Sequence, residues 1–152
     1  MELYELAKKN NLNVGKEDSF DHIYFLLFVD KIEQSLGVKS VDFVFDYPPS
    51  QAALAKLTKE GWADRFEMYW KGFEIANAFN ELVCPQVQKI RFLEEQKSRA
   101  SQGKEFIPID DEFIDSLYYG LPPTAGIAMG LERLFMACFD IKVISSIKPF
   151  SR

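Results

Sequence analysis

The hydrophobic and polar positions at the start of the chain predict two helices. Residues 2–10 carry apolar side chains at helical spacing, as expected for a short amphipathic helix. A longer apolar stripe covers residues 18–36, where Asp18 or Ser19 can cap the start and Gly37 can end the helix. Such a stripe is typical of a helix face packed into a core, so we expect no ligand there.

Period-two alternation replaces the helical pattern in the middle of the chain. Residues 40–47 alternate and predict a strand that ends at Pro48. Residues 65–70 and 73–79 alternate on either side of Lys71-Gly72, and glycine supplies the positive φ that a two-residue turn needs. These two segments therefore predict an antiparallel hairpin. The apolar face of the strand predicted at residues 40–47 comprises Val41, Phe43 and Phe45.

Helical spacing returns after the hairpin. Pro85 stands where the first helical residue tolerates proline, and the pattern continues to about Ser101, just before Gly103. Asp110 is suited to cap another helix, which ends at Gly120. In the first of these helices, the side chains expected to face inward are Val87, Ile90 and Leu93.

Pairing across the hairpin turn brings two acidic residues together. Glu67 and Glu74 become diagonal neighbours on one face, beside the small side chains of Ala76 and Ala78. Two carboxylates next to alanines could hold a hard cation and leave room for a ligand. An ordinary solvated face fits the same pattern, and the hairpin alone leaves both interpretations open. The other face is expected to be the core, and it comprises Phe66, Met68, Trp70, Phe73 and Ile75.

Three further residues of the second strand could extend such a site. Asn77, Phe79 and Glu81 share the parity of the expected core face, not that of the two glutamates. Bringing them to the same site would require a bulge or bend within residues 76–78. Regular strand geometry does not predict that bend.

A stretch of small residues near the C-terminus is the second candidate site. Gly126, Ala128 and Gly130 share one face of a short strand, and helical spacing begins at Leu131. A junction between a strand and a helix exposes N–H groups that favour a phosphate. Arg133, one turn into that helix, is a fixed positive charge suited to phosphate oxygens. A glycine-rich packing strand with a surface arginine fits the pattern equally well.

Composition narrows the class of protein. The chain has 152 residues, of which 47% are hydrophobic, so we expect one globular domain with a substantial core. The net charge of −5 argues against a main nucleic-acid interface on this segment. No apolar run approaches the roughly 20 residues of a membrane span. Cys84 and Cys138 have no metal-ligand spacing and predict reduced thiols, which favours the cytoplasm.

Both candidate segments resemble one known family. Residues 65–82 follow the pattern R-F-E-x-[FY]-x-x-G-x-E-[IL]-[GA]-N-[GA]-F-x-E-L of class II aminoacyl-tRNA synthetases of the lysyl type. Residues 126–133 resemble motif 3 of these synthetases, in the family's order. The hairpin stretch is closer still to the paralogous ligases that attach (R)-β-lysine to elongation factor P, and the S-Q-A-A-L-A segment at residues 50–55 is also similar to theirs. The resemblance implies an α+β fold in which helices flank an antiparallel sheet.

The resemblance implies a role for each candidate residue. In this family ATP and an amino acid react on the sheet to give an acyl-adenylate and pyrophosphate. Glu67 and Glu74 match the carboxylates that hold Mg²⁺, and Arg133 matches the catalytic arginine that clamps the triphosphate. ATP-binding positions are Glu74, Ile75, Gly130 and Arg133. Positions for the amino-acid substrate are Asn77, Phe79, Glu81, Ala76 and Ala128, with Glu81 the partner for an ammonium group.

The resemblance also implies what the protein acts on. The leading hypothesis is a ligase that activates lysine or β-lysine and transfers it to a lysine of elongation factor P. The alternatives are a lysyl-tRNA synthetase that charges tRNA-Lys and a remnant that only binds a partner. Motifs 1 and 2 have no counterpart here, so residues 1–152 are interpreted as the C-terminal part of a catalytic domain. We expect this part alone to be inactive and the complete protein to be a homodimer.

Several positions distinguish the chain within the family. Ala78 stands where glycine is usual, and Glu132 where aspartate precedes the motif 3 arginine. Ala76 and Ala128 stand where lysyl-tRNA synthetases usually have glycine and the β-lysine ligases have alanine. The resemblance therefore favours the ligases over the synthetases.

Overall fold

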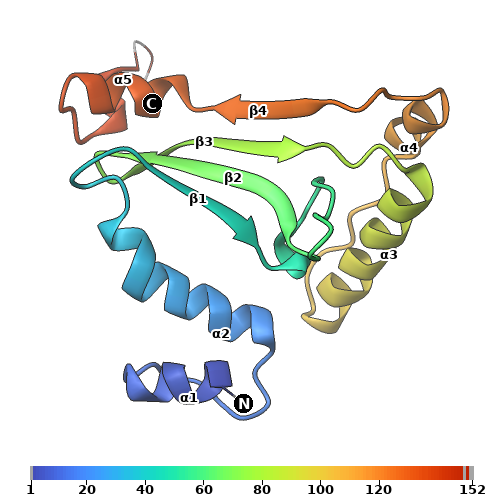
Figure 1. The fold of residues 1–152 in the computed structure, drawn as a ribbon, viewed down its shortest axis with the longest axis horizontal. Helices are drawn as coiled ribbons and strands as arrows, with labels where there is room; N and C mark the ends of the chain where they lie inside the picture. The colour runs from blue at the N-terminus through green and yellow to red at the C-terminus, as the bar shows by residue number, and fades with distance from the viewer. Residues whose placement is uncertain (1, 149, 151–152) are drawn as a thin grey trace. The chain divides into compact units, whose positions relative to one another are not determined.

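The computed structural model describes residues 2–148 and 150 and has an α+β architecture (Figure 1). The strands form a four-stranded antiparallel sheet in the order β1-β2-β3-β4, which confirms the predicted fold class. No helix within the described residues is long and apolar enough to cross a membrane. The helices are α1 (Glu2–Lys9), α2 (Phe20–Leu27), α3 (Pro85–Ser101), α4 (Asp111–Tyr118) and α5 (Leu131–Cys138). The strands are β1 (Asp42–Tyr47), β2 (Ala63–Trp70), β3 (Phe73–Asn80) and β4 (Ala125–Met129).

The chain divides into two compact units, each made of segments that are distant in the sequence. The first unit comprises Met1–Phe43, Glu67–Ala76 and Met129–Arg152, and the second comprises Val44–Phe66 and Asn77–Ala128. Strands β2 and β3 are therefore each divided between the two units.

The N-terminal helices of the first unit pack on one another through their apolar stripes. Ala7, Val14, Ile23 and Leu27 form a buried cluster, in which Ala7 is wholly covered. The side chain of Ser19 caps α2 by accepting a hydrogen bond from the backbone N–H of His22. This cap and the apolar spacing explain why the helix forms where the pattern predicts it.

Gly37 holds the hairpin within the first unit. Its φ is +69°, and its carbonyl oxygen accepts a hydrogen bond from the backbone N–H of Lys71. A Cβ on Gly37 would lie only 2.6 Å from the backbone nitrogen of Trp70. Only glycine tolerates both the positive φ and this close approach, which explains why glycine stands at position 37, where the helix was predicted to end.

The second unit packs helix α3 on a short irregular segment after β1. The guanidinium group of Arg91 donates hydrogen bonds to the carbonyl oxygens of Ala53 and Ala55, at 3.0 and 2.6 Å. An isolated bridge then pairs Ala55 with Glu81, directly after β3. Helices α3 and α4 also contact one another, with the rings of Phe92 and Phe113 6.0 Å apart.

The structure corrects several predicted details of the helices. Residues 18–36 do not form one continuous α-helix, because α2 passes into a π-helical turn at Phe28–Ile32 and a 3-10 turn at Glu33–Ser35. The prediction that α3 buries its apolar side chains is wrong. Its buried residue is Gln88, which is 1% exposed and lies on the face that carries the anchored Arg91. Three side chains that were predicted to face inward are exposed in the structure: Val87, Ile90 and Leu93.

The faces of the strands also differ from the prediction. On the hairpin, Tyr69, Ala76 and Ala78 are buried although they belong to the face expected to be outside. Only Ile75 of the expected core face is fully buried. Alternation identifies the members of a face but not which face another element covers, and small alanines allow close packing on their side. The apolar face predicted for residues 40–47 is exposed at Val41, Phe43 and Phe45.

Candidate active site

The β2–β3 turn fixes which side chains share a face. Lys71 and Gly72 have φ values of 52° and 76°, so both central residues of the turn are left-handed, as in a type I′ hairpin. The strands end at Trp70 and begin again at Phe73. The turn predicted from the sequence is confirmed, and its register places Glu67 and Glu74 on one face.

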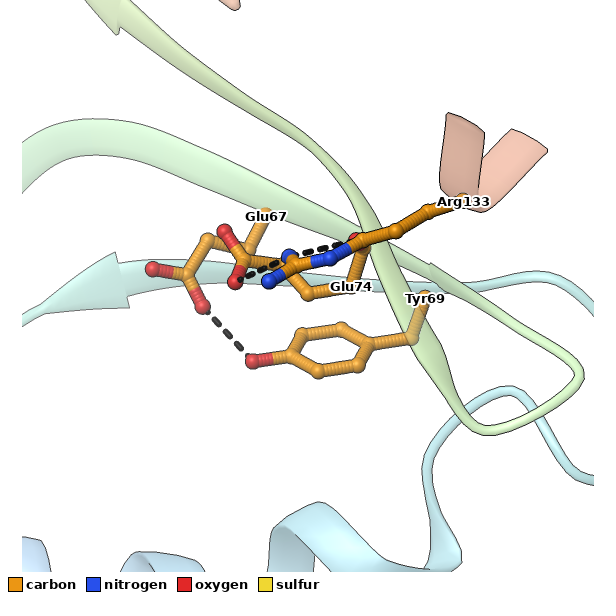
Figure 2. A network of polar contacts seen from close by, with 4 residues as sticks. All are labelled: Glu67, Tyr69, Glu74 and Arg133. Carbon is orange, nitrogen blue, oxygen red and sulfur yellow. Dashed lines mark hydrogen bonds and ion pairs between the residues drawn. The ribbon is translucent and has the colours of Figure 1, made fainter. Parts of the chain in front are cut away.

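Glu67 is held by a tyrosine of its own strand. The hydroxyl group of Tyr69 donates a hydrogen bond of 2.7 Å to Oε2 of Glu67 (Figure 2). Tyr69 is only 3% exposed. Burial, and then the hydrogen bond to Glu67, raise the pKa of Tyr69 far above its ordinary value. The hydroxyl group therefore keeps its proton and remains a donor.

Glu74 is held by the arginine of the second candidate segment. Arg133 reaches from the first turn of α5 and donates from one guanidinium nitrogen to the carbonyl oxygen of Glu74 at 3.0 Å (Figure 2). The same nitrogen lies 3.3 Å from the Glu74 carboxylate oxygen Oε2. Both side chains remain partly accessible to solvent, at 52% for Arg133 and 35% for Glu74. A ligand can therefore reach this pair.

Gly130 stands at the junction that the sequence predicts between strand and helix. It is the N-cap residue of α5, and no side chain caps the helix there. Its N–H group donates to the carbonyl oxygen of Ile75 at 2.9 Å, which joins the junction to β3 close to Glu74. The first turn of α5, which no side chain caps, and Arg133 thus lie beside Glu74, and a helix N-terminus next to a cation favours a phosphate.

The donor set at the hairpin fits a magnesium ion that is shared with a phosphate. Glu67 and Glu74 offer carboxylate oxygens, which are hard ligands. The part of the chain that the structure describes has no group of three or more His, Cys, Asp or Glu side chains placed to hold a metal. A magnesium ion here would therefore take its remaining ligands from phosphate oxygens and water, as Mg²⁺ commonly does.

The second unit contains the other predicted substrate residues. The backbone N–H of Glu81 donates to the carbonyl oxygen of Thr124 at 3.0 Å, beside the start of β4. A Cβ on Gly126 would overlap Oε1 of Glu81, so the side chain of Glu81 occupies the space that glycine leaves. The bare face predicted on β4 thus provides room for the carboxylate that is expected to bind an ammonium group.

The ring of Phe79 makes a cation–π contact with Arg65, which also contacts the ring of Tyr47. The guanidinium group of Arg65 lies 4.4 Å from the ring centre of Tyr47 and 5.1 Å from that of Phe79. Arg65 also donates to the carbonyl oxygen of Gln51 at 3.0 Å. Arg65 and Phe79 line a cavity of about 330 Å³ together with polar groups that include Asp64.

The predicted residues thus fall into two groups, one in each unit. Glu67, Glu74, Ile75, Ala76, Gly130 and Arg133 belong to the first unit, and Asn77, Phe79, Glu81 and Ala128 to the second.

Sequence reasoning assigned no role to Tyr69 or Arg65. Tyr69 could have been found, because alternation places it on the face of Glu67. The stacking of Arg65 left no signal in the pattern, since it depends on Tyr47, which lies on a different strand.

The fold and these motifs are those of an amino-acid-activating enzyme family. The family model of class II tRNA synthetases (D, K and N) matches residues 28–152. The chain belongs to this family, as the motifs predicted. The elongation factor P–(R)-β-lysine ligase of Proteus mirabilis (strain HI4320) is 37% identical over 152 residues, a match that covers 97% of this chain and 47% of that protein. The chain thus spans about half the length of this curated relative.

Proposed function

We propose that this chain is the C-terminal portion of the catalytic domain of an ATP-dependent ligase that activates lysine or β-lysine and transfers it to elongation factor P. The observation that carries the proposal is the hairpin site in which Arg133 pairs with Glu74 and Tyr69 orients Glu67 (Figure 2). The similarity to a ligase named for (R)-β-lysine and elongation factor P supports the choice of substrates.

The first step would be adenylation of the amino acid. The substrate carboxylate attacks the α-phosphorus of ATP, a new O–P bond forms, and the bond to the bridging oxygen of pyrophosphate breaks. The attacking carboxylate is already ionised, so no general base is required. Catalysis then consists of positioning and electrostatic stabilisation of the charge that develops on pyrophosphate.

The first unit would hold the nucleotide. Glu67 and Glu74 would hold Mg²⁺, which offsets phosphate charge when it is bound. Arg133 would exchange the Glu74 carboxylate for phosphate oxygens while it keeps its hydrogen bond to the Glu74 carbonyl oxygen. Gly130 would let the phosphates approach the start of α5. Ile75 is 1% exposed, and its carbonyl oxygen accepts from Gly130, so it would act by fixing that junction.

The second unit would hold the amino acid. Glu81 would pair with an ammonium group of the substrate, and Asn77 and Phe79 would contact its chain. Ala128 would limit the space around the substrate, and Ala76 is a further substrate position that we propose in the first unit. In the second step, the neutral ε-amine of a lysine on elongation factor P attacks the acyl carbonyl carbon and forms an amide bond. The bond between the acyl carbon and the phosphate oxygen breaks, AMP leaves, and the nitrogen loses a proton to solvent. Such an enzyme acts in the cytoplasm, and we expect the full-length protein to be a homodimer.

Exchange of labelled pyrophosphate into ATP tests the proposal. The full-length protein should catalyse exchange that depends on lysine or β-lysine and should then label elongation factor P. Charging of tRNA-Lys with a preference for α-lysine would instead identify a lysyl-tRNA synthetase. Absence of exchange with every amino acid tested would leave only a binding function.

A further inference from the structure

The two hairpin carboxylates are held by partners of different charge. Glu74 faces the guanidinium group of Arg133, which is a permanent cation. Glu67 accepts from the hydroxyl group of Tyr69, which is neutral. A cation offsets the negative charge of a carboxylate, whereas the contribution of a neutral donor is to orient the carboxylate.

The geometry around Tyr69 is suited to fixing Glu67. The ring is buried, so the hydroxyl group has little freedom to move. The backbone at Tyr69 and Trp70 lies directly against Gly37, where a Cβ would come within 2.7 Å of the Tyr69 carbonyl carbon. The hydrogen bond engages Oε2 of Glu67 and so fixes the orientation of the carboxylate (Figure 2).

We propose that Tyr69 is a positioning residue that preorganises Glu67 as a metal ligand, while Glu74 becomes a ligand only when Arg133 turns to the phosphates. This inference rests on the proposed function, because it takes the magnesium role of Glu67 as given. A hydrogen-bonded partner of a metal ligand fixes the orientation of that ligand, and its loss typically lowers metal affinity about 10- to 100-fold. Tyr69 would thus set the metal affinity without touching the metal.

Tyr69→Phe removes the hydroxyl group and keeps the buried ring. Mn²⁺ serves as the probe, and its binding to the protein with a non-hydrolysable ATP analogue is followed by electron paramagnetic resonance. We expect Tyr69→Phe to weaken Mn²⁺ binding about 10-fold or more. The matched control is Tyr119→Phe, because the side chain of Tyr119 is 93% exposed. It should bind Mn²⁺ as the wild type does.

The magnesium dependence of the exchange reaction gives a second readout. Tyr69→Phe should need more Mg²⁺ for half-maximal rate and should approach the wild-type rate at saturating Mg²⁺. A residue that only packs the core would lower the rate at every Mg²⁺ concentration. A lower rate without a shift in Mg²⁺ dependence would therefore overturn the proposal.

Glu67→Gln separates this inference from the proposed function. If Glu67→Gln loses Mn²⁺ binding and Tyr69→Phe retains it, Tyr69 has no positioning role and the proposed function stands. If Glu67→Gln itself binds Mn²⁺ normally, the proposed metal site is wrong.

A measurement on the wild-type protein avoids dependence on how Tyr69→Phe folds. With tyrosine labelled by ¹³C at Cζ, the signal of Tyr69 should shift on addition of Mg²⁺ and the ATP analogue. The same addition to Glu67→Gln should leave that signal unchanged. An unchanged signal in the wild type would count against the proposal.

Discussion

Arg133 and Glu74 are 59 positions apart in the sequence, yet one guanidinium nitrogen of Arg133 contacts both the carbonyl oxygen and the carboxylate of Glu74. The carbonyl contact fixes where the guanidinium group lies. The carboxylate contact pairs the positive charge of Arg133 with the negative charge of Glu74. This double contact joins motif 3 to the hairpin.

Arg133→Lys tests the value of the fixed guanidinium group. Lysine keeps the positive charge but cannot hold the carbonyl oxygen and a phosphate with one planar group. Losing one oriented electrostatic donor typically costs about 100- to 1,000-fold in rate, and we expect a loss of that order in pyrophosphate exchange. Arg99→Lys, whose arginine donates to the carbonyl oxygen of Glu105, should exchange normally. A wild-type rate in Arg133→Lys would refute the phosphate role.

Glu67→Gln and Glu74→Gln should each lower the adenylation rate severely, by roughly 3–4 kcal/mol of transition-state stabilisation. Each substitution removes a charged ligand and keeps the shape of the side chain. Excess Mg²⁺ should restore only part of the rate. Both variants should unfold at temperatures near that of the wild type, because both side chains are only partly buried. Near wild-type rates at saturating Mg²⁺ would mean that the glutamates form an ordinary solvated face.

Gly126→Ala and Gly130→Ala test separate roles for the two glycines of motif 3, one near the amino acid and one near the nucleotide. A methyl group on Gly126 would displace the Glu81 carboxylate, so we expect weaker amino-acid binding, measured as a raised KM for the amino acid. Gly130 has a φ of −77°, and the nearest atom to a Cβ there would be 3.5 Å away. The fold therefore tolerates Gly130→Ala, and an increase in KM for ATP in that variant would reflect contact with the nucleotide. A normal KM for both substrates would contradict the two assignments.

Gly37→Ala should destabilise the protein more than Gly72→Ala does. Both glycines have positive φ, which costs roughly 1–2 kcal/mol for a residue with a Cβ. A Cβ on Gly72 meets nothing within 4 Å, whereas one on Gly37 meets the backbone of Tyr69 and Trp70. Overpacking adds roughly 1–3 kcal/mol, so the free energies of unfolding should differ by about that amount. Equal losses in chemical denaturation would show that the close approach is easily relieved.

The sequence predicted the strands and the turn of the hairpin well. The turn at Lys71-Gly72, the cap at Ser19 and the junction at Gly130 were all recognisable, because each depends on residues close in the sequence. These local signals were enough to place Glu67 and Glu74 on one face.

The sequence predicted burial less well. Gln88 is buried while the apolar residues of the same helix are exposed, because the packed face of α3 is set by the contacts of Arg91 with Ala53 and Ala55. Those contacts join residues 36 and 38 positions apart, and a local pattern carries no record of them. The partners of Arg133 and Glu81 were hidden for the same reason.

Ala128→Gly tests the choice between α-lysine and β-lysine. Ala76 is 2% exposed beside Glu74, and Ala128 is an exposed residue of β4. A methyl group in a tight pocket shifts discrimination by roughly 1–3 kcal/mol, which is about 10- to 200-fold. The amino group of β-lysine lies one carbon farther from its carboxylate than that of α-lysine does, so a methyl group in the pocket affects the two amino acids differently. We expect the full-length protein to activate β-lysine better than α-lysine.

Removing the methyl group of Ala128 should narrow or reverse that preference. Glycine inside a strand costs roughly 0.5–1 kcal/mol of stability, so a thermal melt must show that the variant is folded under the assay conditions. Ala53→Gly is the matched control for a lost methyl group, because Ala53 is exposed and has a φ of 49° that glycine adopts readily. The measurement is the ratio of kcat/KM for the two amino acids in pyrophosphate exchange. A wild-type enzyme that prefers α-lysine and charges tRNA would overturn the assignment as a ligase for elongation factor P.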